Sequence, residues 1–302
     1  MKIRGSILEC IGGTPILRLG NLSRVAGAEI LGKAEYLNPA GSLKDRVALA
    51  MVLAAEKRGE LRPGSTLVEA TAGNTGIGLA LVAAARGYRF VAVMTEADRG
   101  PKSEAMEAMG AEVAYTPPGL AWDGDDGPLG VAARLAQARS GVFLNQFANP
   151  ANPDVHERTT GAEIAATLGD QLDVLVVGVG TGGTATGLAR ALRPGRPGLR
   201  IVGVSGEGSY LGTSRPGDRI AGITPDFAPP VFARHLLDAV TTVTAEEAAA
   251  AARRIAESEG IPAGHSSGAS LVVAEREARE RPGATILILL GDSVRNYPRL
   301  GR

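Results

Sequence analysis

Short β-branched runs alternate with longer Ala- and Leu-rich stretches along most of the chain, and this alternation strongly constrains its fold. We expect strands at 65–70, 88–94, 111–116, 173–178, 200–205 and 284–290. We expect helices at 47–59, 75–87, 101–109, near 160–168, and at 184–192, 245–259 and 268–280. Because a helix between two strands returns the chain to the same sheet edge, the sheets should be mostly parallel and covered on both faces. The sequence therefore predicts an α/β fold.

Composition excludes several classes of protein. Of the 302 residues 44% are hydrophobic and 21% charged, and the formal net charge is zero, so no long-range field attracts nucleic acid or an anionic membrane. We find neither an apolar stretch of membrane-spanning length nor the apolar region of a signal peptide. The single cysteine, Cys10, excludes an internal disulfide and a cysteine-based metal cluster. We expect a cytoplasmic protein with no bound metal and no nucleic-acid or membrane partner.

A glycine-rich loop follows the strand predicted at 173–178. Gly178, Gly180 and Gly183 spell G-x-G-x-x-G, and Glu207 ends the next apolar run, where a ribose-binding acid would stand in a dinucleotide site. A nicotinamide or flavin enzyme is therefore one interpretation, and a tight turn that needs glycine for steric reasons is another. Thr181 and Thr184 place hydroxyl groups among the backbone N–H groups of a helix start. This arrangement favours a terminal phosphate monoester over a dinucleotide.

Two further stretches have both a functional and an ordinary interpretation. In "NPAGSLKDR" (38–46), Lys44 stands just before a predicted helix and can be a reactive amine or a solvated surface charge. In "EATAGNTGIGLA" (69–80), Thr71, Asn74 and Thr75 lie at a helix start. There they can form a carboxylate-sized anion site or simply cap the helix.

Six motifs occur together in one order: "IGGTPILRL", "NPAGSLKDR", "TAGNTGIGLA", "NQFANPANP", "GVGTGGTATG" and "AGHSSGA". On these motifs the chain resembles the cysteine synthase and cystathionine β-synthase family of fold-type II pyridoxal-phosphate enzymes, most closely cysteine synthase (O-acetylserine sulfhydrylase). The resemblance implies a tryptophan synthase β-like fold with two three-layer α/β domains, twisted, mostly parallel sheets and the cofactor in the cleft between the domains. It implies a larger phosphate-binding domain at 1–39 plus 146–302, a smaller, mobile substrate-binding domain at 40–145, and a homodimer.

The resemblance also assigns roles to individual residues. It implies pyridoxal 5'-phosphate as the cofactor, Lys44 as the catalytic lysine that forms the Schiff base, and Ser266 as the partner of the pyridine nitrogen. The cofactor phosphate would be bound by Gly180, Thr181, Gly182, Gly183 and Thr184, and the ring hydroxyl by Asn74. The substrate carboxylate would be bound by Thr71, Ala72, Gly73, Asn74 and Thr75 together with Gln146.

The implied reaction is a β-replacement through an aminoacrylate intermediate, with sulfide or a thiol as nucleophile. "NPAGSLKDR" and "NPANPDVH" favour the formation of L-cysteine from O-acetyl-L-serine, or O-phosphoserine, and sulfide. "GDSVRNY" (291–297), with Asp292 and Ser293 expected beneath the pyridine ring, favours cystathionine formation from serine and homocysteine. A serine or threonine dehydratase is a further alternative. The family also implies a possible partner, the C-terminal tail of serine acetyltransferase.

Three positions depart from the family pattern. Ala72 stands where many relatives have serine, which removes one hydroxyl donor to the substrate carboxylate. His265 precedes Ser266 where an aliphatic residue or glycine is common, and it can be a buried, hydrogen-bonded histidine or can tune the protonation of cofactor or substrate. Arg158 can recognise a more acidic donor such as O-phosphoserine, or it can form a surface salt bridge.

Overall fold

The computed structural model describes residues 3–212 and 218–296, which form two compact units. The first unit consists mainly of Asn38–Asn152 and includes the N-terminal residues up to Ile11. The second consists of Gly12–Leu37 and Pro153–Arg295. The domain ranges implied by the resemblance stay a prediction.

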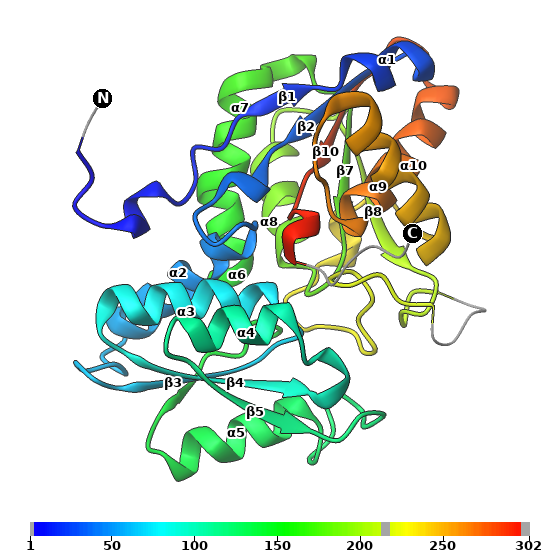
Figure 1. Cartoon of the computed structure of the whole chain (residues 1–302). Helices are drawn as coiled ribbons and strands as arrows, with labels where there is room; N and C mark the ends of the chain where they lie inside the picture. Colours follow the sequence, from blue (N-terminus) through cyan, green and yellow to red (C-terminus); the bar gives the residue numbers. More distant parts are fainter. Residues whose placement is uncertain (1–2, 213–217, 297–302) are drawn as a thin grey trace. The chain divides into compact units, whose positions relative to one another are not determined.

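The first unit is built on a parallel four-stranded sheet in the order β5-β4-β3-β6. Its strands are β3 (Thr66–Ala70), β4 (Arg89–Thr95), β5 (Glu112–Thr116) and β6 (Val142–Phe143). Its helices are η1 (Ile7–Cys10), α2 (Lys44–Lys57), α3 (Asn74–Arg86), η3 (Glu96–Asp98), α4 (Pro101–Ala108) and α5 (Pro128–Ala138). Helices α2, α3 and α4 lie on one side of the sheet and α5 on the other (Figure 1).

The second unit is built on a six-stranded sheet in the order β1-β2-β10-β7-β8-β9. Its strands are β1 (Ile16–Arg18), β2 (Glu29–Lys33), β7 (Val174–Gly178), β8 (Arg200–Gly206), β9 (Ala239–Val243) and β10 (Thr285–Leu289). Its α-helices are α1 (Gly20–Ala26), α7 (Ala162–Leu168), α8 (Gly183–Leu192), α9 (Ala245–Glu259) and α10 (His265–Glu280), and α6 (Ala151–Val155) begins at the end of the first unit. The shorter turns are η2 (Glu35–Leu37), the π-helix η4 (His156–Gly161), η5 (Gly169–Gln171), η6 (Arg234–Leu236) and η7 (Val294–Asn296).

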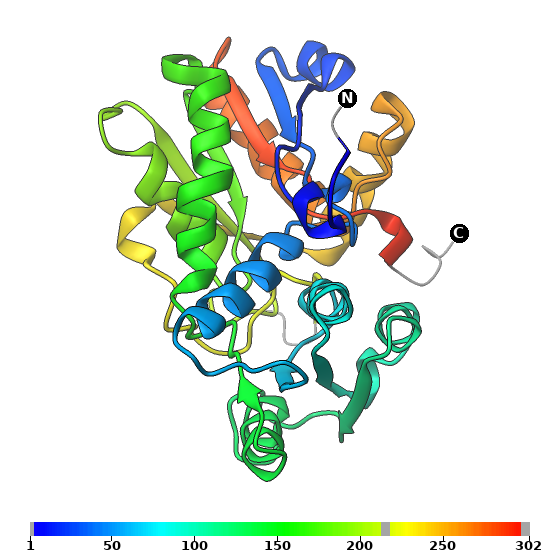
Figure 2. The ribbon, with the colours of Figure 1, turned by 90° about the vertical axis from the view of Figure 1, so that its left-hand side faces the viewer.

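Two hydrophobic cores lie on the two faces of this second sheet. Helices α1, α9 and α10 cover one face, where Ile30, Val174 and Val176 are buried against Ile255 and Leu271. Helices α7 and α8 cover the other face, where Leu175 and Val177 are buried against Ile164 and Leu188 (Figures 1 and 2). Because consecutive residues of a strand point to opposite faces, the apolar runs read from the sequence are those of strands buried on both sides.

The predicted α/β class is confirmed, since every paired strand is parallel to its neighbour except β1, which is antiparallel to β2. Two predicted helix starts were wrong. Helix α2 begins at Lys44 rather than at residue 47, and α10 begins at His265 rather than at residue 268. Apolar periodicity misses both first turns because each carries polar residues. Lys44 is therefore the first residue of a helix, not the residue before one.

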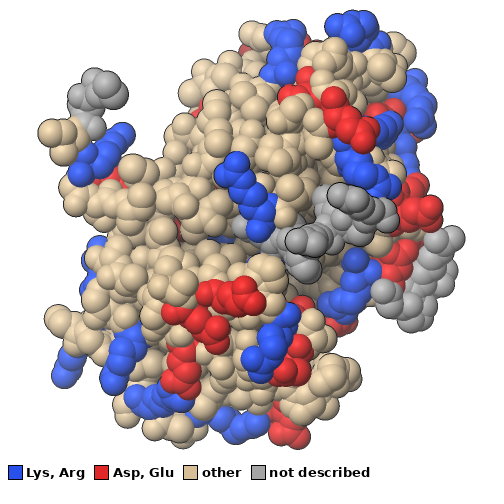
Figure 3. Space-filling model, viewed as in Figure 1, with Lys and Arg blue, Asp and Glu red and all other residues tan. Residues whose placement is uncertain are grey.

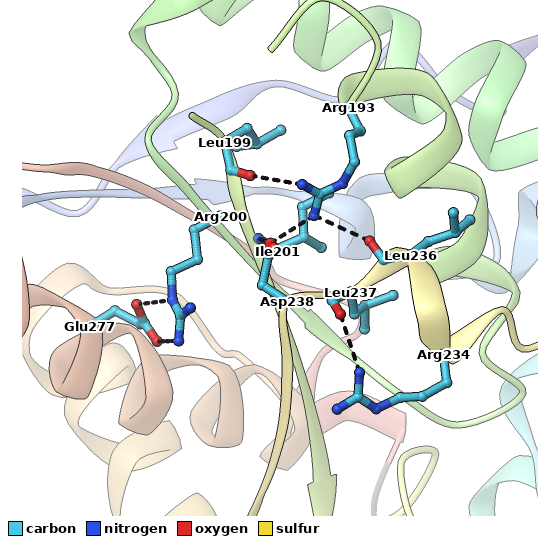
Figure 4. A network of polar contacts seen from close by, with 9 residues as sticks. All are labelled: Arg193, Leu199, Arg200, Ile201, Arg234, Leu236, Leu237, Asp238 and Glu277. Atoms are coloured by element: carbon cyan, nitrogen blue, oxygen red, sulfur yellow. Dashed lines mark hydrogen bonds and ion pairs between the residues drawn. The ribbon is translucent and has the colours of Figure 1, made fainter. Parts of the chain in front are cut away.

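A polar network closes one end of the second sheet (Figure 4). Arg193, at the C-terminus of α8, donates to Asp238 Oδ2 (2.7 Å), and the same oxygen accepts the N–H of Ile201 (2.7 Å). Beside it, Arg200 forms two hydrogen bonds with Glu277 of α10 (2.8 and 3.1 Å). Because Arg200 begins β8, this network lies at the amino ends of the parallel strands. Ligands of such sheets bind at the carboxyl ends of the strands, so we assign this network a role in stabilising the fold.

Charge on the described residues is mixed. In the view of Figure 3 the Lys and Arg side chains are scattered, and several of them stand next to Asp and Glu side chains. None of the described helices has both the length and the apolar character needed to cross a membrane.

Candidate active site

In the second unit, the glycine-rich loop joins β7 to the N-terminus of α8. Gly182, at the N-cap position, has φ +79°, a left-handed conformation that favours glycine, and it has no side chain with which to cap the helix. The N–H of Gly183 donates to Thr181 Oγ1 (3.3 Å). The first turn of a helix presents backbone N–H groups and the positive end of the helix dipole, so this turn is suited to an anion.

A second segment packs so closely against this loop that two of its positions have room only for glycine. A Cβ at Gly180 would collide with the carbonyl oxygen of Gly222, and a Cβ at Gly182 with the ring of Phe232. The packed segment is held by hydrogen bonds: Thr186 Oγ1 donates to the carbonyl of Val231 (3.0 Å) and accepts the N–H of Ala233 (2.9 Å). The loop Gly180–Thr184, called the cradle below, is therefore packed too closely against this segment to carry side chains at Gly180 and Gly182.

His156 supports the hydroxyl of Thr184 at this loop. The imidazole is fully buried; Nε2 lies 3.2 Å from Thr184 Oγ1, and Nδ1 lies 3.0 Å from Thr160 Oγ1. His156 begins the π-helical turn η4, a distortion found most often at functional sites. Sequence analysis assigned it no role, because its partner Thr184 is 28 residues away.

Ser266 lies at the same edge of the second sheet. Strands β7 and β10 pair in parallel, so the loops that follow them emerge side by side. Ser266 is in the first turn of α10, and the N–H groups of Gly264 and Gly291 bond to Asp292 O (3.1 Å) and Ser267 Oγ (3.2 Å). Asp292 is thus held beside Gly264, two residues before Ser266 at the start of α10.

The departures from the family pattern can now be placed. His265 is half-buried; burial lowers its pKa, the Asp292 carboxylate opposes this, and Arg253 adds to the lowering. The lowered pKa favours the neutral form of the imidazole. Arg158 is exposed, while its neighbour Glu157 lies 3.8 Å from Arg190.

In the first unit, Lys44 begins α2 after a tightly bonded loop. Asp45 Oδ2 accepts the N–H of Ala40 (2.6 Å), and Ser42 Oγ accepts the N–H of Lys44 (3.1 Å). Burial raises the pKa of Asp45 to about 7, against the opposing effect of its hydrogen bonds with Ala40 and Ser42. Helix α3 approaches so closely at Gly78 that a Cβ there would lie 3.2 Å from the carbonyl oxygen of Lys44. The backbone of Lys44 is therefore fixed from both sides.

Few other lysines are candidates for the reactive amine, because the chain has only five lysines. Lys33 is buried and forms an ion pair with Glu163 (2.6 Å), Lys57 is exposed, and the aliphatic part of Lys102 covers Gly73. The remaining lysine, at position 2, lies outside the described residues.

The structure brings the predicted Thr71–Thr75 loop and Gln146 together within the first unit. Thr71 Oγ1 accepts the N–H groups of Gly73 (3.0 Å) and Gly76 (3.3 Å). Thr75 Oγ1 donates to Gln146 Oε1 (2.6 Å), and Gln146 Nε2 donates to the carbonyl of Ala70 (3.0 Å). The proton of Thr75 is thus engaged by the protein, which leaves backbone N–H groups and the Thr71 hydroxyl proton for a ligand.

The described part of the first unit therefore holds Lys44, Asn74, the Thr71–Thr75 loop and Gln146, and the second unit holds the Gly180–Thr184 cradle and Ser266. Within the described residues, no group of three or more His, Cys, Asp or Glu side chains is arranged to bind a metal ion.

Known proteins resemble this chain along almost its whole length. Residues 7–292 match the family described as "Pyridoxal-phosphate dependent enzyme". Cystathionine beta-synthase of Mus musculus is 41% identical over 98% of this chain and 55% of its own length. The corresponding protein of Apis mellifera is 39% identical over 98% of this chain and 61% of its own length. The chain thus spans little more than half the length of these curated relatives.

Solved structures show the same fold. The crystal structure of O-ureido-L-serine synthase has a TM-score of 0.92 and 39% identity, covering 98% of this chain and 94% of that one. A lysine-to-alanine variant of that enzyme, bound to O-ureido-L-serine, has a TM-score of 0.91 and 40% identity, covering 98% of this chain and 92% of that one. From the family match and these relatives, we conclude that the chain belongs to the family of pyridoxal-phosphate dependent enzymes.

Proposed function

We propose that this protein catalyses a β-replacement that forms L-cysteine from O-acetyl-L-serine, or O-phospho-L-serine, and sulfide. The observation that carries the proposal is the glycine cradle at 180–184, which suits a phosphate monoester, in a chain whose Lys44 begins a helix after a rigid loop. A solved relative at 39% identity is named for O-ureido-L-serine, a serine derivative substituted on its side-chain oxygen. This supports chemistry at the β-carbon of an amino acid.

The residues present fit pyridoxal phosphate. The cradle at Gly180 and Gly182 has no room for a Cβ, and the amides of the first turn of α8, with the Thr184 hydroxyl, would hold the phosphate. When bound, the cofactor supplies the electron sink that weakens bonds at the α-carbon of an amino acid. Asn74 would bind the ring hydroxyl and Ser266 the ring nitrogen.

Lys44 would perform the proton transfer. Its amine would hold the cofactor covalently, and once displaced by the substrate it would accept the proton from the substrate α-carbon. Ser266, a hydroxyl rather than a carboxylate, does not favour a proton on the ring nitrogen. This choice moderates the electron sink and favours elimination and replacement over transamination.

The substrate carboxylate would bind at the Thr71–Thr75 loop. Backbone N–H groups and the Thr71 hydroxyl would donate to it, while Gln146 holds Thr75 in place (2.6 Å). Because the donors are mostly backbone groups, Ala72 in place of serine removes one side-chain donor and should weaken affinity rather than abolish the reaction.

A second candidate is cystathionine formation from serine and homocysteine. It is favoured by the "GDSVRNY" ending, whose Asp292 is bonded through its carbonyl to Gly264 at the start of α10 (3.1 Å). The curated relatives at 39–41% identity carry the name of that activity. The two functions share every residue above and differ in the donor and the sulfur nucleophile.

The first test of the proposal is the covalent link at Lys44. After borohydride reduction, mass spectrometry of the wild type should find the cofactor mass on the peptide that contains Lys44. Lys44→Ala should lose that mass and turnover. Lys57→Ala, at the exposed other end of the same helix, should keep both. Cofactor mass on another lysine would contradict the assignment.

The second test identifies the reaction. The protein loaded with pyridoxal phosphate is mixed with O-acetylserine, O-phosphoserine or serine, each with sulfide or homocysteine. The products are then separated and identified by mass spectrometry. Cysteine formed with sulfide supports the proposal. Cystathionine as the dominant product supports the second candidate, and release of pyruvate with neither nucleophile consumed supports a dehydratase.

The homodimer, the cytoplasmic location and the docking of a serine acetyltransferase tail rest on the resemblance and remain part of this proposal. Sedimentation of the purified protein, alone and with a synthetic tail peptide, tests the first and the last of these.

A further inference from the structure

Glu69 is a carboxyl group that the proposed reaction does not use. It lies on β3 of the first unit, in the otherwise apolar run "TLVEA", and its side chain is completely buried. Oε1 accepts the N–H of Gln146 (3.1 Å). Oε2 is also buried, and within residues 3–212 and 218–296 it has no hydrogen-bond partner. A buried carboxylate with one unsatisfied oxygen is costly, and the protonated acid costs less because it carries no buried charge.

Cations on the neighbouring elements do not offset this cost. The elements packed against β3 are β4, β6, α3 and α5, and their charged residues are Arg89, Arg86 and Arg134. Arg89 stands opposite Thr66 and is exposed, Arg86 bonds to Glu56 (2.6 Å), and Arg134 lies 3.4 Å from Asp126. The charged residues Lys44, Asp45 and Arg46 belong to α2, which packs on α3. Burial therefore raises the pKa of Glu69 to about 8, although its interactions with the backbone N–H groups of Gln146 and Asn145 and with the Gln146 side chain lower it.

A continuous set of contacts joins Glu69 to the proposed carboxylate loop. The backbone of Gln146 bonds to Glu69, and the side chain of Gln146 accepts from Thr75 (2.6 Å) and donates to Ala70 (3.0 Å). Asn152 Nδ2 bonds to the carbonyl of Gln146 (2.8 Å). Gln146 thus contacts Glu69 through its backbone N–H and contacts Thr75, at the start of α3, through its side chain. A change of charge at Glu69 acts directly on the group that orders the loop.

We propose that Glu69 is a positioning residue that must be protonated for a substrate carboxylate to bind at the Thr71–Thr75 loop. This inference rests on the proposed function of that loop. The physical reason is that an ionised Glu69 would place a second buried negative charge behind the anion site, where the low dielectric strengthens repulsion. It would also pull the Gln146 N–H toward itself and shift the amide that holds Thr75.

The experiment measures the affinity of the protein for a carboxylate that has no amino group. The pH dependence of this affinity then contains no contribution from the titration of a substrate amine. The probe is 3-hydroxypropanoate, which is ionised throughout, and binding to the cofactor-loaded protein is followed by calorimetry from about pH 6.5 to about pH 9.5. In the wild type the dissociation constant should rise about tenfold per pH unit above the pKa of Glu69. Glu69→Gln keeps the size of the side chain without its charge and should give a nearly constant dissociation constant.

The control is Glu107→Gln, an exposed glutamate on α4 of the same unit, which should keep the wild-type pH dependence. Circular dichroism and the melting temperature confirm that each variant is folded. The same alkaline loss of affinity in Glu69→Gln and in the wild type overturns the proposal. Failure of the wild type to bind the probe at any pH contradicts the proposed function of the loop itself.

A second measurement needs neither cofactor nor substrate. Infrared spectroscopy of the unloaded wild type should show the carbonyl bands of two buried, protonated carboxylic acids, one from Asp45 that disappears around pH 7 and one from Glu69 that disappears around pH 8. The Glu69 band should be missing in Glu69→Gln and present in Glu107→Gln. A wild type without this band, or a Glu69→Gln variant that retains it, shows that Glu69 is ionised and overturns the proposal even if the variant binds poorly.

Discussion

Asp45 and Glu69 show how burial sets the protonation of single residues in this protein. Both are carboxyl groups with almost no exposed surface, and burial raises their pKa values to about 7 and about 8. Each lies beside a residue of the candidate site, Lys44 or the Thr71–Thr75 loop. The raised pKa values reduce the negative charge that these two groups place near sites proposed to bind anionic ligands.

The raised pKa of Glu69 makes stability depend on pH. The folded state binds this proton more tightly than the unfolded state, so its stabilising effect is complete below the ordinary pKa near 4.5 and is lost as pH rises through about 8. Glu69→Gln has no proton to lose at this position, so its stability should not fall in this way as the pH rises. We expect the variant to gain stability relative to the wild type between about pH 5 and about pH 9, by about 2 to 5 kcal/mol at 1.4 kcal/mol per pKa unit.

Urea unfolding of both proteins at the two pH values measures this difference. Glu107→Gln, at an exposed position on α4 of the same unit, is a control for the loss of one carboxylate. Parallel pH dependence of the wild type and Glu69→Gln would show that Glu69 does not hold the proton.

At the scale of elements, the junction between β7 and α8 carries the candidate phosphate site. Its glycines meet two separate requirements, a left-handed backbone at Gly182 and close contact with Gly222 and Phe232. The sequence motif indicates only that small residues are needed. Mutagenesis can measure which requirement at Gly182 has the larger effect, the left-handed backbone or the close contact with Phe232.

Gly182→Ala should cost more than backbone strain alone. Gly195 has nearly the same φ, +77° against +79°, and open space where a Cβ would stand. Gly195→Ala should therefore lose about 1 to 2 kcal/mol of stability and keep its affinity for pyridoxal phosphate. Gly182→Ala should lose more stability and at least about tenfold in cofactor affinity, because Phe232 must move. Equal effects of the two variants, measured by urea unfolding and fluorescence titration, would contradict this account of the cradle.

The whole molecule should be stabilised by the cofactor through the phosphate. A ligand that binds only the folded state adds about 2.7 kcal/mol at one hundred times its dissociation constant. Pyridoxal 5'-phosphate should raise the melting temperature in a concentration-dependent way, whereas pyridoxal, which cannot occupy the cradle, should raise it much less at equal concentration. Gly182→Ala should reduce the difference between the two. Equal shifts from both compounds would show that the cradle does not hold the phosphate.

The sequence alone established the features that depend on local order. Hydrophobic periodicity predicted the parallel α/β architecture, and G-x-G-x-x-G marked the glycine turn between β7 and α8, the candidate phosphate site. The six motifs singled out Lys44 and Ser266 by resemblance. Periodicity placed the starts of α2 and α10 three residues late, since their first turns are polar and each is held by contacts with a preceding or distant segment.

Only the tertiary structure decided the features that join distant parts of the chain. His156 meets Thr184 across 28 residues and Glu69 meets Gln146 across 77. Gly222 and Phe232 pack on Gly180 and Gly182, which come much earlier in the chain. Periodicity reports which face of an element is buried, but it does not report which element covers that face. A buried polar side chain is explained by its partner, and the partner is known only after the chain has folded around both.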